Sequence, residues 1–185
     1  MANRDYLILD ACVLLNLLAT GVIEKILKIA SYESIICVLV KGESLYLRNE
    51  TDVNEIVSVA LQPFIKMGII KLCDLETDHE QQMFVNLAAK LDDGEAMSLA
   101  IALSRSWHLA TDDKKARKIF IENTQNEQQL TSTSNLIKEW ADKEGIDDEA
   151  IKVILTKVEI MAHYHPSASD ANFQWWSGIL VSSKK

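Results

Sequence analysis

The 185-residue chain has only six glycines and two prolines, which excludes a collagen-like or loop-dominated protein. Its three cysteines are an odd number, which argues against a disulfide framework. Cys12, Cys37 and Cys73 each lie in an apolar run, so we expect small buried thiols in a reducing compartment. With 48% hydrophobic residues, the chain is too apolar for intrinsic disorder. It has the proportions of one soluble globular domain with a small appendage.

Positive charge is also scarce, with 19 Lys and Arg against 27 Asp and Glu and a net charge of −8. Any contact with nucleic acid must therefore come from a local basic patch. The apolar runs are shorter than the roughly 20 residues of a membrane span, and Asp10 interrupts the N-terminal apolar stretch, unlike a secretory signal. We expect a cytoplasmic protein without a membrane partner. P-loop, G-x-G-x-x-G and G-x-S-x-G motifs are absent from the sequence.

Short apolar runs alternate with segments of helical periodicity, which predicts a mostly parallel sheet covered by helices on both faces. The expected strands are 6–9, 34–39, 69–73, 107–111 and 128–131. The expected helices are 13–20, 22–30, 40–48, 53–64, 77–90, 92–103, 113–121, 134–144 and 147–161. We expect a domain over residues 1–145 and a C-terminal helical extension over 146–185, whose tail from His165 has no clear period.

Acidic residues follow the expected strands. Asp10 comes directly after the first strand, Asp112 and Asp113 follow the fourth, and Glu43 and Glu95 lie in first turns of expected helices. The carboxyl ends of parallel strands share one edge of a sheet, where ligands bind. Carboxylates crowded there repel one another unless they are protonated or neutralised by a cation. Oxygen ligands without His or Cys favour Mg²⁺ or Mn²⁺, which predicts phosphodiester hydrolysis.

Each acid also has a structural interpretation. Asp93 is a good helix N-cap, and Glu95 then only favours the helix dipole. Glu43 alone is typical of a solvated helix residue, and Asp113 can cap the helix that follows it. Asp10 is the hardest to explain structurally, because a carboxylate at the end of an apolar strand is costly without a partner.

A basic segment, Lys114-Lys115-Ala116-Arg117-Lys118, follows the two aspartates. It suits the phosphates that flank a scissile bond, where it would position the substrate without reading its sequence. The alternatives are a solvated helix face and a pairing of Arg117 with Asp113.

The chain resembles the PIN domain family in four ordered motifs. They are LDACVLLNLL (residues 9–18), VLVKGE (38–43), DDGEAMSLAIAL (92–103) and LATDDKKAR (109–117), within a resemblance that covers residues 5–140. The GEA segment and the later DDxxAR are similar to the prokaryotic branch that includes VapC-like toxin nucleases. The resemblance implies a three-layer α/β/α sandwich and Mg²⁺- or Mn²⁺-dependent cleavage of single-stranded RNA.

The same resemblance assigns site roles. Asp10 and Glu43 would be the first two acids, Glu95 the third and Asp112 the fourth, with Asp113 an alternative or additional member. We expect all five to act in catalysis and Asp10, Glu95 and Asp112 to bind the metal. For substrate binding we expect Asn16, Thr111, Lys114, Lys115 and Arg117. Cys12 stands where the family often has Ser or Thr, which removes a hydroxyl donor beside Asp10.

The expected function is a metal-dependent endoribonuclease, with a toxin of a toxin–antitoxin pair as its specific form. Candidate partners besides RNA are an antitoxin protein and a second copy of the chain. The alternative is a catalytically silent PIN-like module that binds RNA or protein. A haloacid dehalogenase-type phosphatase is disfavoured because Ala11 and Cys12 replace its D-x-D motif. His163 and His165 do not share a helix face, which disfavours a metal site there.

Overall fold

The computed structural model describes residues 5–43 and 45–181. By contacts, the chain forms two compact units, each assembled from three segments. The first unit comprises residues 1–14, 31–44 and 60–132, and the second comprises 15–30, 45–59 and 133–185. The expected domain boundary after residue 145 falls inside the second unit. The division into a domain over 1–145 and an extension over 146–185 stays a prediction.

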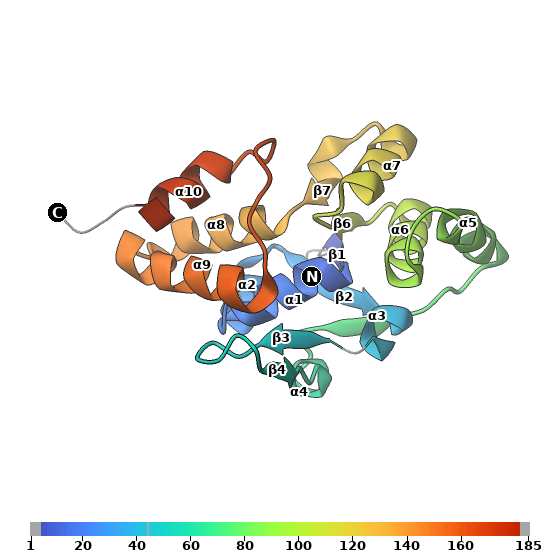
Figure 1. Ribbon diagram of the computed structural model, residues 1–185. Helices are drawn as coiled ribbons and strands as arrows, with labels where there is room; N and C mark the ends of the chain where they lie inside the picture. The colour runs from blue at the N-terminus through green and yellow to red at the C-terminus, as the bar shows by residue number, and fades with distance from the viewer. Residues whose placement is uncertain (1–4, 44, 182–185) are drawn as a thin grey trace. The chain divides into compact units, whose positions relative to one another are not determined.

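A parallel sheet of five strands forms the centre of the first unit (Figure 1). Its strands are β1 (Asp5–Leu9), β2 (Tyr32–Cys37), β5 (Lys71–Cys73), β6 (His108–Ala110) and β7 (Leu130–Thr131). The order is β5-β2-β1-β6-β7, so the first strand is central. Ile8 pairs in register with Ile35 on one side and Leu109 on the other. The buried run of β1 therefore reflects a strand with neighbours on both edges.

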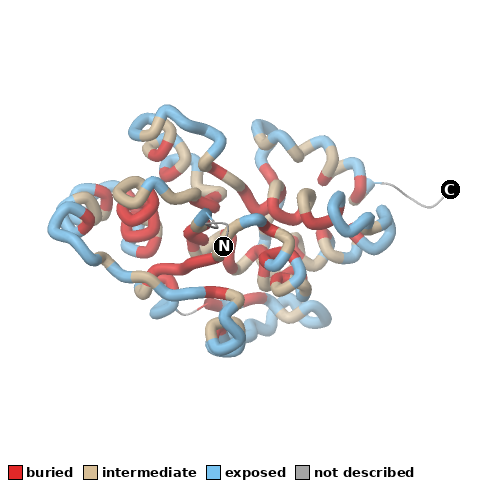
Figure 2. The backbone as a smooth tube through the Cα atoms, turned by 180° about the vertical axis from the view of Figure 1, so that it is seen from behind, coloured by how far each residue is buried: buried red, intermediate tan, exposed pale blue. Residues whose placement is uncertain are grey.

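Helices of the first unit connect these strands. They are α3 (Val38–Gly42), α4 (Gln62–Lys66), α5 (Asp78–Ala88), α6 (Asp93–Arg105), α7 (Lys114–Thr124) and a 3₁₀ turn (Glu127–Gln129). Helix α6 contacts β1, β2 and β6 and packs between α5 and α7. Within residues 94–102 of this helix every residue except Glu95 is buried, and the helix shows largely red in Figure 2.

The second unit is mainly helical. It contains α2 (Ile23–Ile29), β3 (Tyr46–Arg48), β4 (Ile56–Ser58), α8 (Thr133–Glu144), α9 (Asp148–Ala162) and α10 (Phe173–Val181). Helix α1 (Ala11–Ala19) begins in the first unit and ends in the second. Helix α8 packs on α2, and α9 contacts both β3 and α10. Asp147 caps α9 by accepting a hydrogen bond from the Ala150 amide at 2.8 Å, as the sequence predicted.

The expected α/β class, with a parallel central sheet flanked by helices and with C-terminal helices, is confirmed. Two expected helices, 40–48 and 53–64, are wrong. Residues 46–48 and 56–58 instead form the antiparallel pair β3 and β4, in which Leu47 lies opposite Val57. The apolar residues of β4 are spaced as in an amphipathic helix, which explains the wrong prediction. Their β-branched side chains also suit a strand, and β3 supplies the backbone hydrogen-bond partners for one.

The C-terminal tail is more regular than its sequence pattern suggested, because it contains α10. Trp176 of this helix is fully buried, and its indole nitrogen donates a hydrogen bond to Glu159 at 3.1 Å. The same carboxylate oxygen binds the His165 ring at 2.5 Å. His165 thus belongs to the packing of α10 on α9. No helix in the described ranges is long and apolar enough to cross a membrane.

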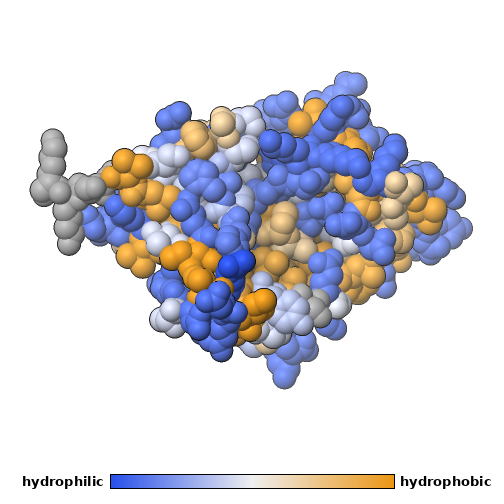
Figure 3. All heavy atoms as spheres, in the orientation of Figure 1, coloured by the Kyte–Doolittle hydropathy of each residue, from blue (hydrophilic) through white to orange (hydrophobic). Residues whose placement is uncertain are grey.

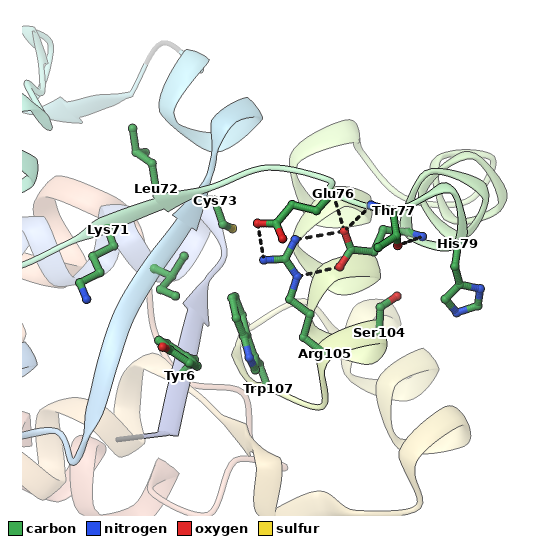
Figure 4. A pocket seen from close by; sticks show the side chains of 12 residues that line it. Tyr6, Lys71, Leu72, Cys73, Glu76, Thr77, His79, Ser104, Arg105 and Trp107 are labelled. Atoms are coloured by element: carbon green, nitrogen blue, oxygen red, sulfur yellow. Dashed lines mark hydrogen bonds and ion pairs between the residues drawn. The ribbon is translucent and has the colours of Figure 1, made fainter. Parts of the chain in front are cut away.

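The start of α5 is fixed by the capping box that the sequence predicted. Thr77 accepts a hydrogen bond from the Glu80 amide at 3.1 Å, and Glu80 in turn accepts one from the Thr77 amide at 3.3 Å. Glu80 is 3% exposed and also receives the Arg105 Nε at 2.7 Å. Arg105 lies over the Trp107 ring, 4.9 Å from its centroid. These side chains line a cavity of about 640 Å³ and join the start of α5 to the end of α6 (Figure 4).

We expect the Glu80–Arg105 pair to make the protein sensitive to acid. Hydrogen bonding to Arg105 lowers the pKa of Glu80 from its ordinary 4.5 to about 2. The pair therefore contributes stability that is present above pH 4.5 and is lost as the pH falls toward 2, at most about 3 kcal/mol. Urea unfolding between pH 2 and 6 should show a smaller acid loss for Glu80→Gln than for the wild type.

The control is Glu24→Gln, which removes an exposed partner of Lys28 on α2. Its acid loss should match that of the wild type. Equal pH dependence of Glu80→Gln and the wild type would contradict the assignment.

Candidate active site

Asp10 lies at the carboxyl end of the central strand and is 2% exposed. Its amide donates to the Ala110 carbonyl at 3.0 Å, which continues the pairing of β1 with β6 by one residue. The next residue begins α1. The strand-to-helix change thus occurs at the aspartate itself, and its side chain is held where the sheet ends.

Neighbouring donors bind the Asp10 carboxylate. The Ala11 amide donates to Oδ1 at 2.6 Å, while the Thr111 hydroxyl and the Cys12 thiol donate to Oδ2 at 2.8 and 3.2 Å. These bonds lower the pKa of Asp10, but burial raises it more, and the charge of Asp113 adds to the rise. The pKa of Asp10 is therefore above its ordinary value. The donors that anchor this carboxylate are neutral, so they orient its oxygen atoms without supplying a positive charge.

Glu43 follows α3 as its C-cap, not the first turn of a longer helix as expected. Gly42 ends α3, and the chain turns toward β3 beyond it. The Glu43 carboxylate lies against Gly94 at the start of α6. Desolvation raises the pKa of Glu43 most, and the charges of Asp10 and Asp92 raise it further.

Glu95 lies in the first turn of α6, as predicted. Its pKa is raised from 4.5 to about 7, first by desolvation and then by the charges of Asp10, Asp113 and Asp92. The first turn of a helix favours a negative charge. Burial and the charges of the other acids outweigh this favourable effect of the helix, because the net shift of the Glu95 pKa is upward. Glu95 therefore interacts electrostatically with Asp10.

Asp112 and Asp113 follow β6 and differ in role. Asp113 caps α7, because its Oδ1 accepts the amides of Lys115 at 2.8 Å and Ala116 at 2.7 Å. This confirms the capping interpretation, yet its charge still acts on Asp10 and Glu95. Asp112 lies beside Cys12, and burial together with the charges of Asp10 and Asp112 strongly raises the pKa of the Cys12 thiol.

The cap at the start of α6 was misplaced from the sequence, and the role of Asp92 was missed. Asp92, not Asp93, is the N-cap residue of α6, and it makes no side-chain capping bond. Its charge acts instead on Glu43 and Glu95. The signal was present in the Asp92-Asp93 pair, but sequence alone does not tell which of two adjacent acids precedes the helix. The Cys12 thiol replaces a hydroxyl as a donor to Asp10.

The basic residues of α7 divide into two kinds. Arg117 donates from Nη1 to the carbonyls of Thr111 and Thr131, both at 3.0 Å, so it ties the ends of β6 and β7 together and does not pair with Asp113. Lys114 and Lys115 are exposed, and Lys115 donates to the carbonyl of Lys90 before α6. Hydrophilic side chains dominate the surface over α7 (Figure 3). A substrate-binding role for Lys114, Lys115 and Arg117 stays a prediction.

Asn16 and Thr111 have structural partners. Asn16 belongs to the second unit, where its amide donates to the Thr133 hydroxyl at 3.1 Å. Thr111 is buried; its hydroxyl donates to Asp10 and accepts from the Asp113 amide at 3.2 Å. Thr111 therefore orients Asp10. Whether either residue binds substrate stays a prediction.

The acids fit a hard divalent cation by chemistry and charge. They offer oxygen donors, and Asp10, Glu43 and Glu95 all have pKa values raised in part by neighbouring carboxylates. The side chains are not drawn together, however: within residues 5–43 and 45–181, no three His, Cys, Asp or Glu residues are placed to hold an ion.

A comparison with known protein families matches the chain to the PIN domain over residues 6–165. The chain belongs to the PIN domain family. PIN domains are generally nucleases and typically use divalent metal ions. Comparisons with curated proteins and with solved structures gave no match. The family and the acids at the edge of the sheet together indicate a nuclease-type fold.

We expect removal of one charge from this group to stabilise the metal-free protein. Because its pKa is about 7 in the fold, ionised Glu95 destabilises the protein increasingly from pH 4.5 to 7 and constantly above. Glu95→Gln should gain about 1 to 2 kcal/mol at pH 8, after allowance for solvent screening, and little at pH 4. Thermal unfolding with a chelator present measures the gain.

The exposed Glu122 of α7 provides the control, since Glu122→Gln removes the same charge outside the group. A lower Tm for Glu95→Gln at pH 8 would show that the carboxylate is stabilising.

Proposed function

We propose that this protein is a metal-dependent endoribonuclease that hydrolyses phosphodiester bonds of single-stranded RNA with Mg²⁺ or Mn²⁺. The observation that carries the proposal is Asp10, buried at the end of the central strand and within electrostatic reach of Glu43, Glu95 and Asp113. Such crowding costs stability without a cation, so it is best explained by a function that uses one.

The acids would hold the ion, with Asp10, Glu95 and Asp112 as the expected ligands and Glu43 beside them. When bound, the ion supplies positive charge that polarises the phosphoryl oxygen and favours attack by water. Thr111 and Cys12 orient the Asp10 carboxylate through their hydrogen bonds. Asp113 caps α7 through Oδ1. It would contribute to ion binding through its charge and its other carboxylate oxygen.

The lysines at the start of α7 support nucleic acid as the substrate. Lys115 donates to the Lys90 carbonyl, and both Lys114 and Lys115 are exposed in the first turn of α7, directly after Asp112 and Asp113. The acids by themselves would repel RNA, so positive charge supplied by residues adjacent in the chain would offset that repulsion. Phosphates on either side of the scissile bond can bind these ammonium groups without sequence preference.

A catalytically silent PIN-like module that binds RNA or protein is the second candidate. The net charge of −8 and the Cys12 thiol at a position where the family often has a hydroxyl favour it. The toxin role, an antitoxin partner and a homodimer stay predictions. Mn²⁺ calorimetry separates the two candidates, because the silent module should bind no ion at these acids.

We expect Asp10→Asn to abolish cleavage while the fold remains. The amide keeps nearly the size of the carboxylate but loses the charge that would hold a cation, so cleavage should fall at least about 100-fold. The measurement is cleavage of end-labelled single-stranded RNA with Mn²⁺, with circular dichroism to verify folding.

The matched control, Asp52→Asn, changes an exposed aspartate in the β3–β4 loop and should cleave like the wild type. Undiminished Mn²⁺-dependent cleavage by Asp10→Asn would refute the site, and absence of cleavage by the wild type would favour the silent module.

Joint replacement of Lys114 and Lys115 by alanine should weaken RNA binding with little change in kcat. Loss of two phosphate contacts on a single strand should also make the slope of log affinity against log salt shallower by about 1.4. Fluorescence anisotropy at several salt concentrations and steady-state kinetics measure both effects. Lys25→Ala, which removes an exposed cation from α2, is the control. An unchanged salt slope would exclude these lysines from the RNA interface.

A further inference from the structure

Gly94 is the second residue of α6 and is buried. Glycine weakens a helix relative to alanine, so it usually needs a backbone reason. Gly21, Gly68 and Gly145 have such a reason in their positive φ angles, but Gly94 does not. The glycine at position 94 must therefore be explained by what surrounds it.

The space beside Gly94 is filled by a side chain of the acidic group. A Cβ at position 94 would overlap Oε1 of Glu43 and would lie 3.3 Å from its Cδ. The same Cβ would lie 3.3 Å from Cγ2 of Val40, a tight but less severe contact. By contrast, a Cβ at Gly178 of α10 would meet nothing within 4 Å. The Glu43 carboxylate thus occupies the volume that any other residue at 94 would need.

We propose that Gly94 is a positioning residue that allows the Glu43 carboxylate to lie on the first turn of α6, beside Asp10 and Asp92. The consequence for metal binding and cleavage rests on the proposed function, whereas the steric coupling of Gly94 and Glu43 does not. An added methyl group displaces the carboxylate, which is the mobile end of a flexible side chain. Because Glu43 lies among like charges, its displacement relieves repulsion and does not unfold the protein.

The test combines Gly94→Ala, Glu43→Ala and the double variant. In the metal-free protein, Gly94→Ala should have a Tm within about 3 °C of the wild type or higher. Its Mn²⁺ affinity, measured by calorimetry, should fall about 10-fold, and its kcat on single-stranded RNA by 10- to 100-fold, the order expected for about 1 Å of misplacement. In the Glu43→Ala background, Gly94→Ala should cause no further loss of affinity or kcat.

Gly178→Ala, which adds the same methyl group to another helix, should leave Mn²⁺ affinity and kcat unchanged. Wild-type affinity and kcat in Gly94→Ala would overturn the proposal. An equal loss in the Glu43→Ala background would also overturn it, because crowding of Val40 would then be the cause. If the wild type does not cleave RNA, the proposed function fails, and the coupling measured through Mn²⁺ affinity still decides the role of Gly94.

Discussion

The first unit depends on how a carboxylate is accommodated at the end of its central strand. Asp10 is surrounded by apolar strands and receives hydrogen bonds from Ala11, Cys12 and Thr111. Thr111 follows β6, so the bond joins the ends of two adjacent strands and also reaches the start of α7 through Asp113. These donors are neutral, and burial still raises the pKa of the carboxylate above its ordinary value.

The acids near the end of the central strand destabilise the metal-free protein when they are ionised. Burial and, to a smaller extent, neighbouring carboxylates raise the pKa values of Glu43 and Glu95, which means that each ionised acid destabilises the metal-free fold. Elsewhere in the first unit, charge is used differently. Glu80 is ionised, buried and paired with Arg105, and it fixes the connection of α5 to α6. The paired Glu80 therefore stabilises the fold, whereas ionised Glu43 and Glu95 destabilise it.

Local sequence signals succeeded where the decisive interactions are short in range. The capping box of Thr77 and Glu80 and the caps at Asp113 and Asp147 each involve residues within one helical turn. Prediction failed over residues 40–64, where a helical period was compatible with the sequence and pairing of β3 with β4 prevailed. It also missed α10, whose formation relies on burial of Trp176 against α9 more than on any periodic pattern.

The sequence by itself determined the strand-to-acid pattern, because apolar runs that end in aspartate have few alternatives in a parallel sheet. It therefore predicted that Asp10 follows β1 and that Asp112 and Asp113 follow β6, and it predicted the family to which the chain belongs. Only the tertiary structure decided that Arg117 ties strand ends together, that Thr111 and Cys12 anchor Asp10, and that Glu43 fills the space beside Gly94. These contacts join residues far apart in the chain or depend on side-chain volume, and no local pattern encodes either.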